Sequence, residues 1–180
     1  MPRLPAAATM PQQLSPMLPA ERRTTLGRMS QTDVQARQQL LGALGEATDD
    51  LAEALASLGA AYEQLDDQQA DRLEKQLFRP VQRAYGSAKR THAAFAGRHG
   101  LPDRGFKTPS PGAPSTGVKG FIENAVAAVA RADTKLVALQ DSLMPIEVGD
   151  PDLRAGLAEV RQLIDGLSTH AHAFVRTFGR

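Results

Sequence analysis

The chain has 180 residues, of which 42% are hydrophobic and 23% are charged, a composition typical of a globular domain. Its formal net charge of +1 creates no field that would attract nucleic acid, so we expect no specific nucleic-acid binding. The absence of cysteine excludes disulfide bridges, thiolate nucleophiles and cysteine-ligated zinc or iron–sulfur sites.

The first 30 residues are predicted to form a disordered tail. Five prolines lie before residue 20, and proline fixes φ and removes a hydrogen-bond donor, so neither a helix nor a central strand can run through them. The same prolines interrupt every apolar stretch that could serve as a secretory signal. No apolar run in the chain approaches the roughly 20 residues of a membrane span. We therefore expect a cytoplasmic protein without a membrane span, whose translation starts at either Met1 or Met29.

Two helices are predicted next, over 33–65 and 68–99, because apolar side chains recur in both at alternating spacings of three and four. The positions that would continue the first apolar stripe into the second segment are polar, so the apolar face changes phase between them. We expect a tight turn there, with Asp66 as the N-cap of the second helix; one continuous bent helix is the alternative. Pro80 predicts a kink within the second helix.

Two further helices are predicted over 117–143 and 151–178, after a long loop over 100–116. The loop contains four prolines, and Gly100 occupies the position that a helix C-cap favours. Asp150, followed by a proline, is typical of the start of a helix. Both helices carry apolar stripes without interruption, and no segment of the chain shows the alternation of a strand.

These four helices predict an all-α fold, with residues 31–180 forming an antiparallel four-helix bundle with coiled-coil-like packing. We expect up-down-up-down topology, because that order demands the least of the 100–116 loop. The alternative is that the loop, which reaches about 50 Å when extended, runs back along the bundle.

Charge is segregated between the first two helices. Residues 33–67 carry eight acids and one base, whereas residues 68–99 carry two acids and seven bases. We expect the two helices to be neighbours that pair their charged flanks, as the helices of coiled coils do. The alternative is a basic strip that binds a polyanion. Its members are Arg72, Lys75, Arg79, Arg83, Lys89 and Arg90.

The motifs of known helical enzymes and metal sites are missing. No glutamate has a histidine three residues later, as di-iron bundles require, and the His-Glu-x-x-His zinc pattern does not occur. There is also no Gly-rich phosphate-binding loop and no Gly-x-Ser-x-Gly. We therefore expect a protein that is not an enzyme, with no catalytic residues, metal or cofactor.

Aromatic and histidine side chains provide one candidate binding site. Up-down-up-down topology would bring the ends of the second and fourth helices and the start of the third to one pole, beneath the 100–116 loop. We predict that a ligand or partner binds at this pole. His170 and His172 point about 200° apart around a helix, so they cannot hold a metal together. The predicted pole consists of His92, Phe95, His99, Phe106, Phe121, His170, His172, Phe174 and Phe178.

The sequence therefore favours a non-enzymatic helical-bundle interaction or scaffold module that binds a protein partner or a second copy of itself. The alternative is a bundle that binds a small apolar ligand or lipid at the predicted pole; a sealed cavity there would favour it.

Overall fold

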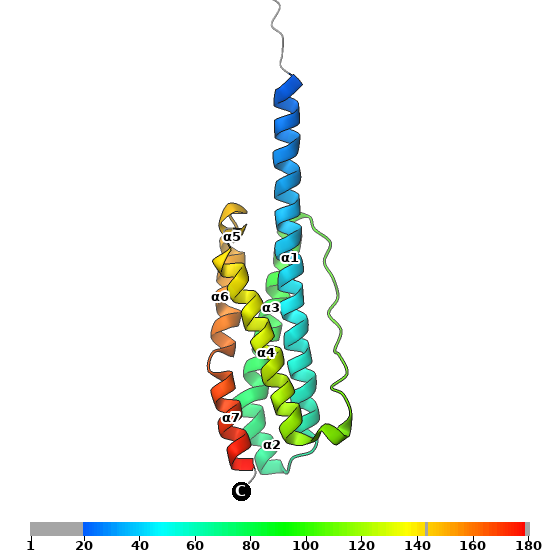
Figure 1. The fold of residues 1–180 in the computed structure, drawn as a ribbon, viewed down its shortest axis with the longest axis vertical. Helices are drawn as coiled ribbons and strands as arrows, with labels where there is room; N and C mark the ends of the chain where they lie inside the picture. Colours follow the sequence, from blue (N-terminus) through cyan, green and yellow to red (C-terminus); the bar gives the residue numbers. More distant parts are fainter. Residues whose placement is uncertain (1–19, 143, 179–180) are drawn as a thin grey trace, which may run out of the picture.

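A computed structural model describes the backbone of residues 20–142 and 144–178. It describes the side chains of residues 31–142 and 144–177. Within them the chain forms helices and connections and contains no strand, which confirms the predicted all-α bundle (Figure 1). None of the helices in these ranges is both long and apolar enough to cross a bilayer. In chain order the helical segments are α1 (Ala20–Tyr62), α2 (Asp67–Leu73), the π-helical turn Glu74–Phe78, α3 (Arg79–His99), the 3-10 turn Pro114–Thr116, α4 (Gly117–Asp141), α5 (Met144–Glu147), α6 (Pro151–Ile164) and α7 (Leu167–Phe178).

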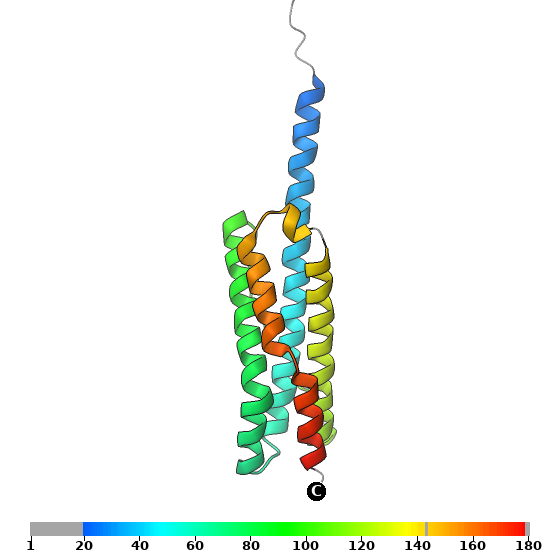
Figure 2. The ribbon, with the colours of Figure 1, turned by 90° about the vertical axis from the view of Figure 1, so that its left-hand side faces the viewer.

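The bundle has four columns: α1, then α2 with α3, then α4, then α6 with α7 (Figures 1 and 2). α1 packs mainly against α3 and α4, and α6 packs mainly against α3. Lys135 of α4 lies 2.7 Å from Asp50 of α1, and Arg98 at the end of α3 lies 2.8 Å from Asp150 at the start of α6. Each column is therefore antiparallel to the columns beside it, whereas α3 and α4 run in the same direction at diagonal corners.

The predicted up-down-up-down order is wrong, because the connection over 100–116 runs the length of the bundle before α4 begins (Figure 1). At the end of this connection, Gln64 Nε2 donates a hydrogen bond of 3.3 Å to the carbonyl of Pro114, which places the start of α4 beside the end of α1. The order is consequently up-down-down-up, with one long crossover. The alternative left open by the sequence, a loop that returns along the bundle, is the one observed.

α1 begins at Ala20 and so starts before residue 33, the predicted first residue of the helix. Residues 20–32 contain no proline, and several of them are good helix formers. Of the tail predicted over 1–30, residues 20–30 are helical, and residues 1–19 lie outside the described ranges. The first turns of α1 project beyond the other columns at the upper end of the bundle (Figure 2).

The predicted turn between the first two helices is confirmed. α1 ends at Tyr62, and Asp66 caps α2 by accepting a hydrogen bond of 2.8 Å from the backbone N–H of Gln69. The irregularity expected at Pro80 takes the form of a π-helical turn just before it, in which the N–H of Arg79 donates to the carbonyl of Glu74. A π-turn adds one residue to a helical turn, and it often accompanies a local disturbance of the hydrogen-bond ladder.

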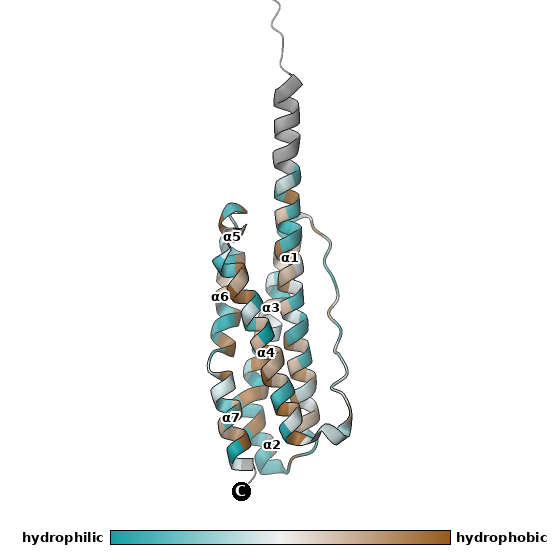
Figure 3. Cartoon of the chain, in the orientation of Figure 1, coloured by the Kyte–Doolittle hydropathy of each residue, from teal (hydrophilic) through white to brown (hydrophobic). Residues whose placement is uncertain are grey.

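Leucine, alanine and valine supply most of the core, as the near absence of aromatic residues requires. Leu44, Leu136 and Leu157 come from three different columns, and each is fully buried at 0% exposure. Figure 3 shows hydrophobic and hydrophilic residues alternating around each column, the pattern of amphipathic helices that bury one stripe.

The fourth column is broken, so the prediction of one helix over 151–178 is wrong. α6 ends at Ile164 and α7 begins at Leu167. Between them Gly166 has φ +70°, a left-handed conformation that glycine adopts without strain. The apolar stripe continues across the break, which is why the periodicity gave no sign of it.

Candidate functional site

The structure divides the predicted pole into two groups at opposite ends of the bundle. α3 and α7 are antiparallel, so their C-terminal ends lie at opposite ends of the bundle. Phe174 of α7 lies at the lower end beside the start of the second column, where Arg72 of α2 lies over its ring, 6.0 Å from the ring centroid. The prediction of a single pole is therefore wrong, and its cause is the mistaken connectivity. The upper group consists of His92, Phe95, His99 and Phe106. The lower group consists of Phe121, His170, His172 and Phe174, and the side chain of Phe178 lies outside the described part of the chain.

The upper group attaches the long connection to the bundle. His92, 1% exposed, meets the ring of Phe106 edge-on at a centroid distance of 5.0 Å. Its Nδ1 lies 3.2 Å from an oxygen of Asp103, and Arg104 covers the ring of Phe106 at 4.8 Å. Burial lowers the pKa of His92 below its ordinary 6.5, although the hydrogen bond and charge of Asp103 oppose this. The arrangement fixes the first part of the connection against α3.

A second buried group joins α3 to α6. Asp150 caps α6 by accepting from the N–H of Leu153 at 2.8 Å, and Arg98 donates two hydrogen bonds to its carboxylate at 2.8 and 3.0 Å. His99 Nε2 lies 3.0 Å from the same carboxylate, and its ring packs 4.6 Å from that of Phe95. Burial raises the pKa of Asp150, whereas the hydrogen bonds from Leu153, His99 and Arg98 lower it. The hydrogen bonds outweigh burial, so the pKa of Asp150 lies below its usual value.

These upper residues have the geometry of structural contacts. Each histidine is paired with its own aspartate, and within the described ranges no Ser or Thr hydroxyl is hydrogen-bonded to either histidine. No group of three or more His, Asp or Glu side chains in the described part of the chain could hold a metal ion. The chemistry of this end is therefore helix capping and loop attachment.

The lower group borders an open groove between α4 and the fourth column. Its lower part is a hollow of about 710 Å³, in which His172, Ala171 and Val175 of α7 face Ile122 and Val126 of α4. Phe121 and Phe174 are buried in the core beside it rather than in its wall. Among the members of the predicted pole whose side chains are described, only His172 lines this hollow.

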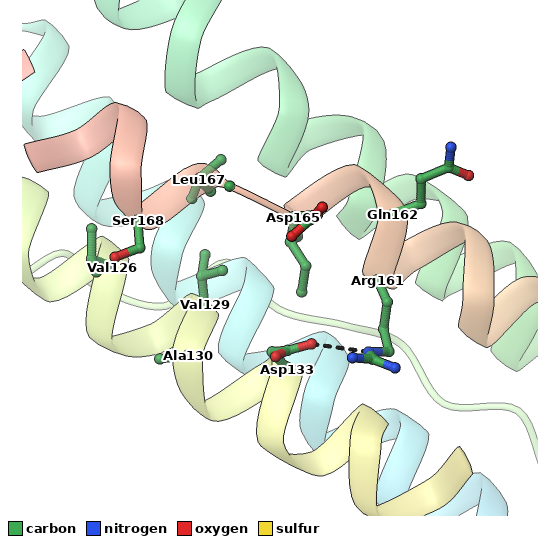
Figure 4. Close-up of a pocket in the computed structure, with 11 residues that line it drawn as sticks. Val126, Val129, Ala130, Asp133, Arg161, Gln162, Asp165, Leu167 and Ser168 are labelled. Carbon is green, nitrogen blue, oxygen red and sulfur yellow. Dashed lines mark hydrogen bonds and ion pairs between the residues drawn. The ribbon is translucent and has the colours of Figure 1, made fainter. Parts of the chain in front are cut away.

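The upper part of the groove lies at the break between α6 and α7. This hollow, of about 600 Å³, is lined by Val126, Val129 and Ala130 of α4 and by the residues around Gly166 (Figure 4). Arg161 crosses it, donating to Asp133 at 3.1 Å and to Gln140 at 2.7 Å. Val126 and Ala130 line both hollows, so the two hollows form one continuous depression, which we call the α4–α7 groove.

The α4–α7 groove was not among the sites predicted from the sequence. Two signals could have indicated it. Gly166 interrupts the last helix with a residue that weakens helices, and Val126 lies beside the core stripe of α4 and widens its apolar face.

Comparison of the chain with protein-family models, curated proteins and solved structures finds no match.

Proposed function

We propose that the protein is a non-enzymatic interaction module that binds an amphipathic helix of a partner protein in the α4–α7 groove. The observation that carries this proposal is the pair of continuous hollows along α4, each hundreds of Å³ in volume and walled by helices. Helical recognition segments dock in such grooves through apolar residues spaced three and four apart.

The floor of the groove supports this occupant. On α4, Ile122, Val126 and Ala130 follow one another at four-residue intervals, and Leu167 and Val175 face them from α7. From residue 122 to residue 133 the α4 wall is about 16 Å long, which matches roughly three turns of a docked helix. The partner segment should therefore present apolar residues at positions i, i+4 and i+7.

Of the six Asp, Glu, Lys and Arg side chains that line the groove, four pair with one another. Lys119 lies 3.7 Å from Glu123, and Arg161 pairs with Asp133. Charged groups that are already paired with one another offer a partner little binding energy, because exposed ion pairs contribute little. The apolar floor is then the main source of binding energy. Specificity then depends on the shape of the partner's apolar face.

Two variants that each replace one alanine of α4 by glutamate test the proposal. Ala130 and Ala138 are both exposed on α4, but only Ala130 lines the groove. A photo-crosslinking amino acid at Ala127, also in the groove, is introduced into the wild type, Ala130→Glu and Ala138→Glu, and the crosslinked proteins are identified by mass spectrometry in the native host. We expect one partner to crosslink to the wild type and to Ala138→Glu but not to Ala130→Glu. Equal crosslinking in all three variants contradicts the proposal, as does a crosslink to a second copy of the chain alone.

The alternative of a small apolar ligand or lipid at the predicted pole has less support. Four hollows on the described surface, two of which make up the α4–α7 groove, have walls that include none of His92, Phe95 and Phe106. These three side chains are packed against their neighbours rather than arranged around a space.

A further inference from the structure

The outer face of α3 carries a line of arginines. Arg79, Arg83 and Arg90 are spaced four and seven apart, so at 100° per residue they lie within about 40° of one line along the helix. All three are exposed, and the buried residues Val81 and Ala88 lie on the opposite side of α3. The line is about 16 Å long, and Gly86 leaves a gap in it between the second and third arginines.

The acids of α1 were expected to neutralise these bases, but they are paired elsewhere. Asp50 and Glu53 bind Arg131 of α4 at 3.1 and 2.6 Å, and Asp50 also binds Lys135. Asp49 binds Arg104 on the long connection. In the described part of the chain no ion pair joins α1 to α3, so the predicted pairing of their flanks is wrong. The reason is that the crossover places α4 and the long connection, rather than α3, against the acidic flank of α1.

Arg83 and Arg90 are consequently left without an acidic partner within 4 Å in the described ranges, whereas Arg79 pairs with Glu74 at 2.9 Å. A shallow hollow of about 410 Å³ lies between the two unpaired arginines, where Gly86 has no side chain. Glu159 of α6 also lines this hollow. Its carboxylate disfavours a small free anion inside the hollow, whereas a longer acidic segment can contact the two exposed arginines from outside it.

We propose that the outer face of α3 is a second docking surface, which binds an acidic segment of a partner protein through Arg83 and Arg90. Arginine suits this role because its planar guanidinium forms paired hydrogen bonds with a carboxylate. About five residues of extended chain, at roughly 3.3 Å each, span the arginine line. Since this surface shares no residue with the α4–α7 groove, the protein can hold two segments at once, and either site can fail without the other.

Two other polyanions fit the surface less well. Single-stranded nucleic acid binds through aromatic stacking platforms, and no aromatic side chain belongs to this line of arginines. Stable binding to an anionic membrane requires an apolar anchor beside the basic residues, and the outer face of α3 offers none among its described exposed residues. Carboxylates on a protein segment need neither feature.

The test uses a fluorescein-labelled octaglutamate peptide, with binding measured by fluorescence anisotropy at about 50 mM salt, where exposed charges are weakly screened. The variant is Arg83→Glu/Arg90→Glu, and both positions are exposed, so folding should persist and circular dichroism checks it. The control is Lys107→Glu/Arg154→Glu, which makes the same change in net charge at exposed cations outside α3. We expect the α3 variant to weaken binding at least about tenfold and the control to change it less than about twofold.

Three results would overturn the proposal. The first is no measurable binding of octaglutamate to the wild type. The second is an equal loss of affinity in the variant and the control, which would mean that only net charge matters. The third is tighter binding of an octathymidylate probe that is lost in the same variant, which would identify the face as a nucleic-acid surface.

Discussion

The guanidinium of Arg104 occupies the space that a side chain on Gly45 would need: a Cβ at Gly45 would lie 2.8 Å from Arg104 Nη2. Arg104 also binds Asp49, one turn further along α1, at 2.6 Å, and covers the ring of Phe106. Phe106 in turn packs against His92 of α3. The missing side chain of Gly45 thus lets the long connection lie across α1 and α3 together.

Gly45→Leu should release this connection. The new side chain displaces Arg104, while the helix itself is preserved because leucine is a good helix former. We expect trypsin to cleave the native protein after Arg104 and Lys107 at least about threefold faster, since proteolysis reports local opening of a segment. The measurement is the rate at which the two fragments appear at low trypsin concentration.

Gly42→Leu is the control for this experiment. Gly42 lies on the same helix, and a Cβ there would meet no atom within 4 Å. The cleavage rate should equal that of the wild type. Equal acceleration in both variants would mean that the leucine acts through α1 itself rather than through Arg104.

Those features of the fold that depend on local chemistry could be predicted from the sequence. Asp66, Gly100 and Asp150 end or begin helices where expected, because a cap is decided by the residue and its near neighbours. The order of the columns could not be predicted, since both topologies bury the same apolar stripes. The choice depends on distant polar contacts such as Arg104–Asp49 and Gln64–Pro114, which periodicity does not reveal.

The candidate sites followed from that choice. The predicted pole relied on α3 and α7 ending together, so one incorrect connection separated His92 from His172. The basic residues of the second helix are visible in the composition, but the sequence does not show that Asp50 and Glu53 face α4 and so leave Arg83 and Arg90 without an acidic partner. Gly166 was visible as a helix-weakening residue, yet the periodicity does not show that it adopts a left-handed conformation, with φ +70°, and ends α6.

His92 should make stability depend on pH. Burial, the largest influence, lowers its pKa, Arg104 lowers it further, and Asp103 and Asp49 raise it. In the unfolded chain the ring takes up a proton near its ordinary pKa of 6.5, while the folded protein resists until a lower pH. The unfolded state therefore binds more protons below about pH 6.5, so stability is complete above that pH and falls as pH decreases, by at most about 1.4 kcal/mol per pH unit.

His92→Gln should flatten this dependence. Urea unfolding between pH 7 and pH 5 gives the slope for the wild type and the variant. His172→Gln is the control, because it makes the same substitution at an exposed histidine. A wild-type slope retained in His92→Gln would assign the pH dependence to another group.

Gly156→Ala should destabilise the protein although alanine favours helices. A Cβ at Gly156 would lie 2.6 Å from Thr91 Cγ2 and would also meet Thr91 Oγ1, and the β-branched threonine has little freedom to move away. Gly97→Ala, on α3 with no atom within 4 Å, should instead stabilise by up to about 1 kcal/mol. We expect thermal unfolding to shift in opposite directions for the two variants. A stabilising Gly156→Ala would show that α3 and α6 are not in such close contact.

Substitutions at two adjacent residues of α4 compare the stability that comes from core burial with the stability that comes from the ion pairs between α1 and α4. Leu136 is 0% exposed, so Leu136→Ala should cost about 2–5 kcal/mol through lost burial and the cavity that remains. The periodicity of the sequence treats Lys135 as an exposed flank, but its Nζ lies 2.7 Å from Asp50, which is only 8% exposed.

Lys135→Ala should therefore cost about 1 kcal/mol, because it removes the ion pair at one oxygen of a largely buried carboxylate whose other oxygen keeps Arg131. Asn124→Ala, at an exposed position of the same helix, should stay within about 0.5 kcal/mol of the wild type. Urea unfolding of these variants, together with Asp50→Asn and the double variant Asp50→Asn/Lys135→Ala, gives the coupling between the two charges. If Lys135→Ala matched Asn124→Ala and the coupling were zero, the acidic flank of α1 would not need α4 for neutralisation, and the explanation for the unpaired arginines of α3 would lose its support.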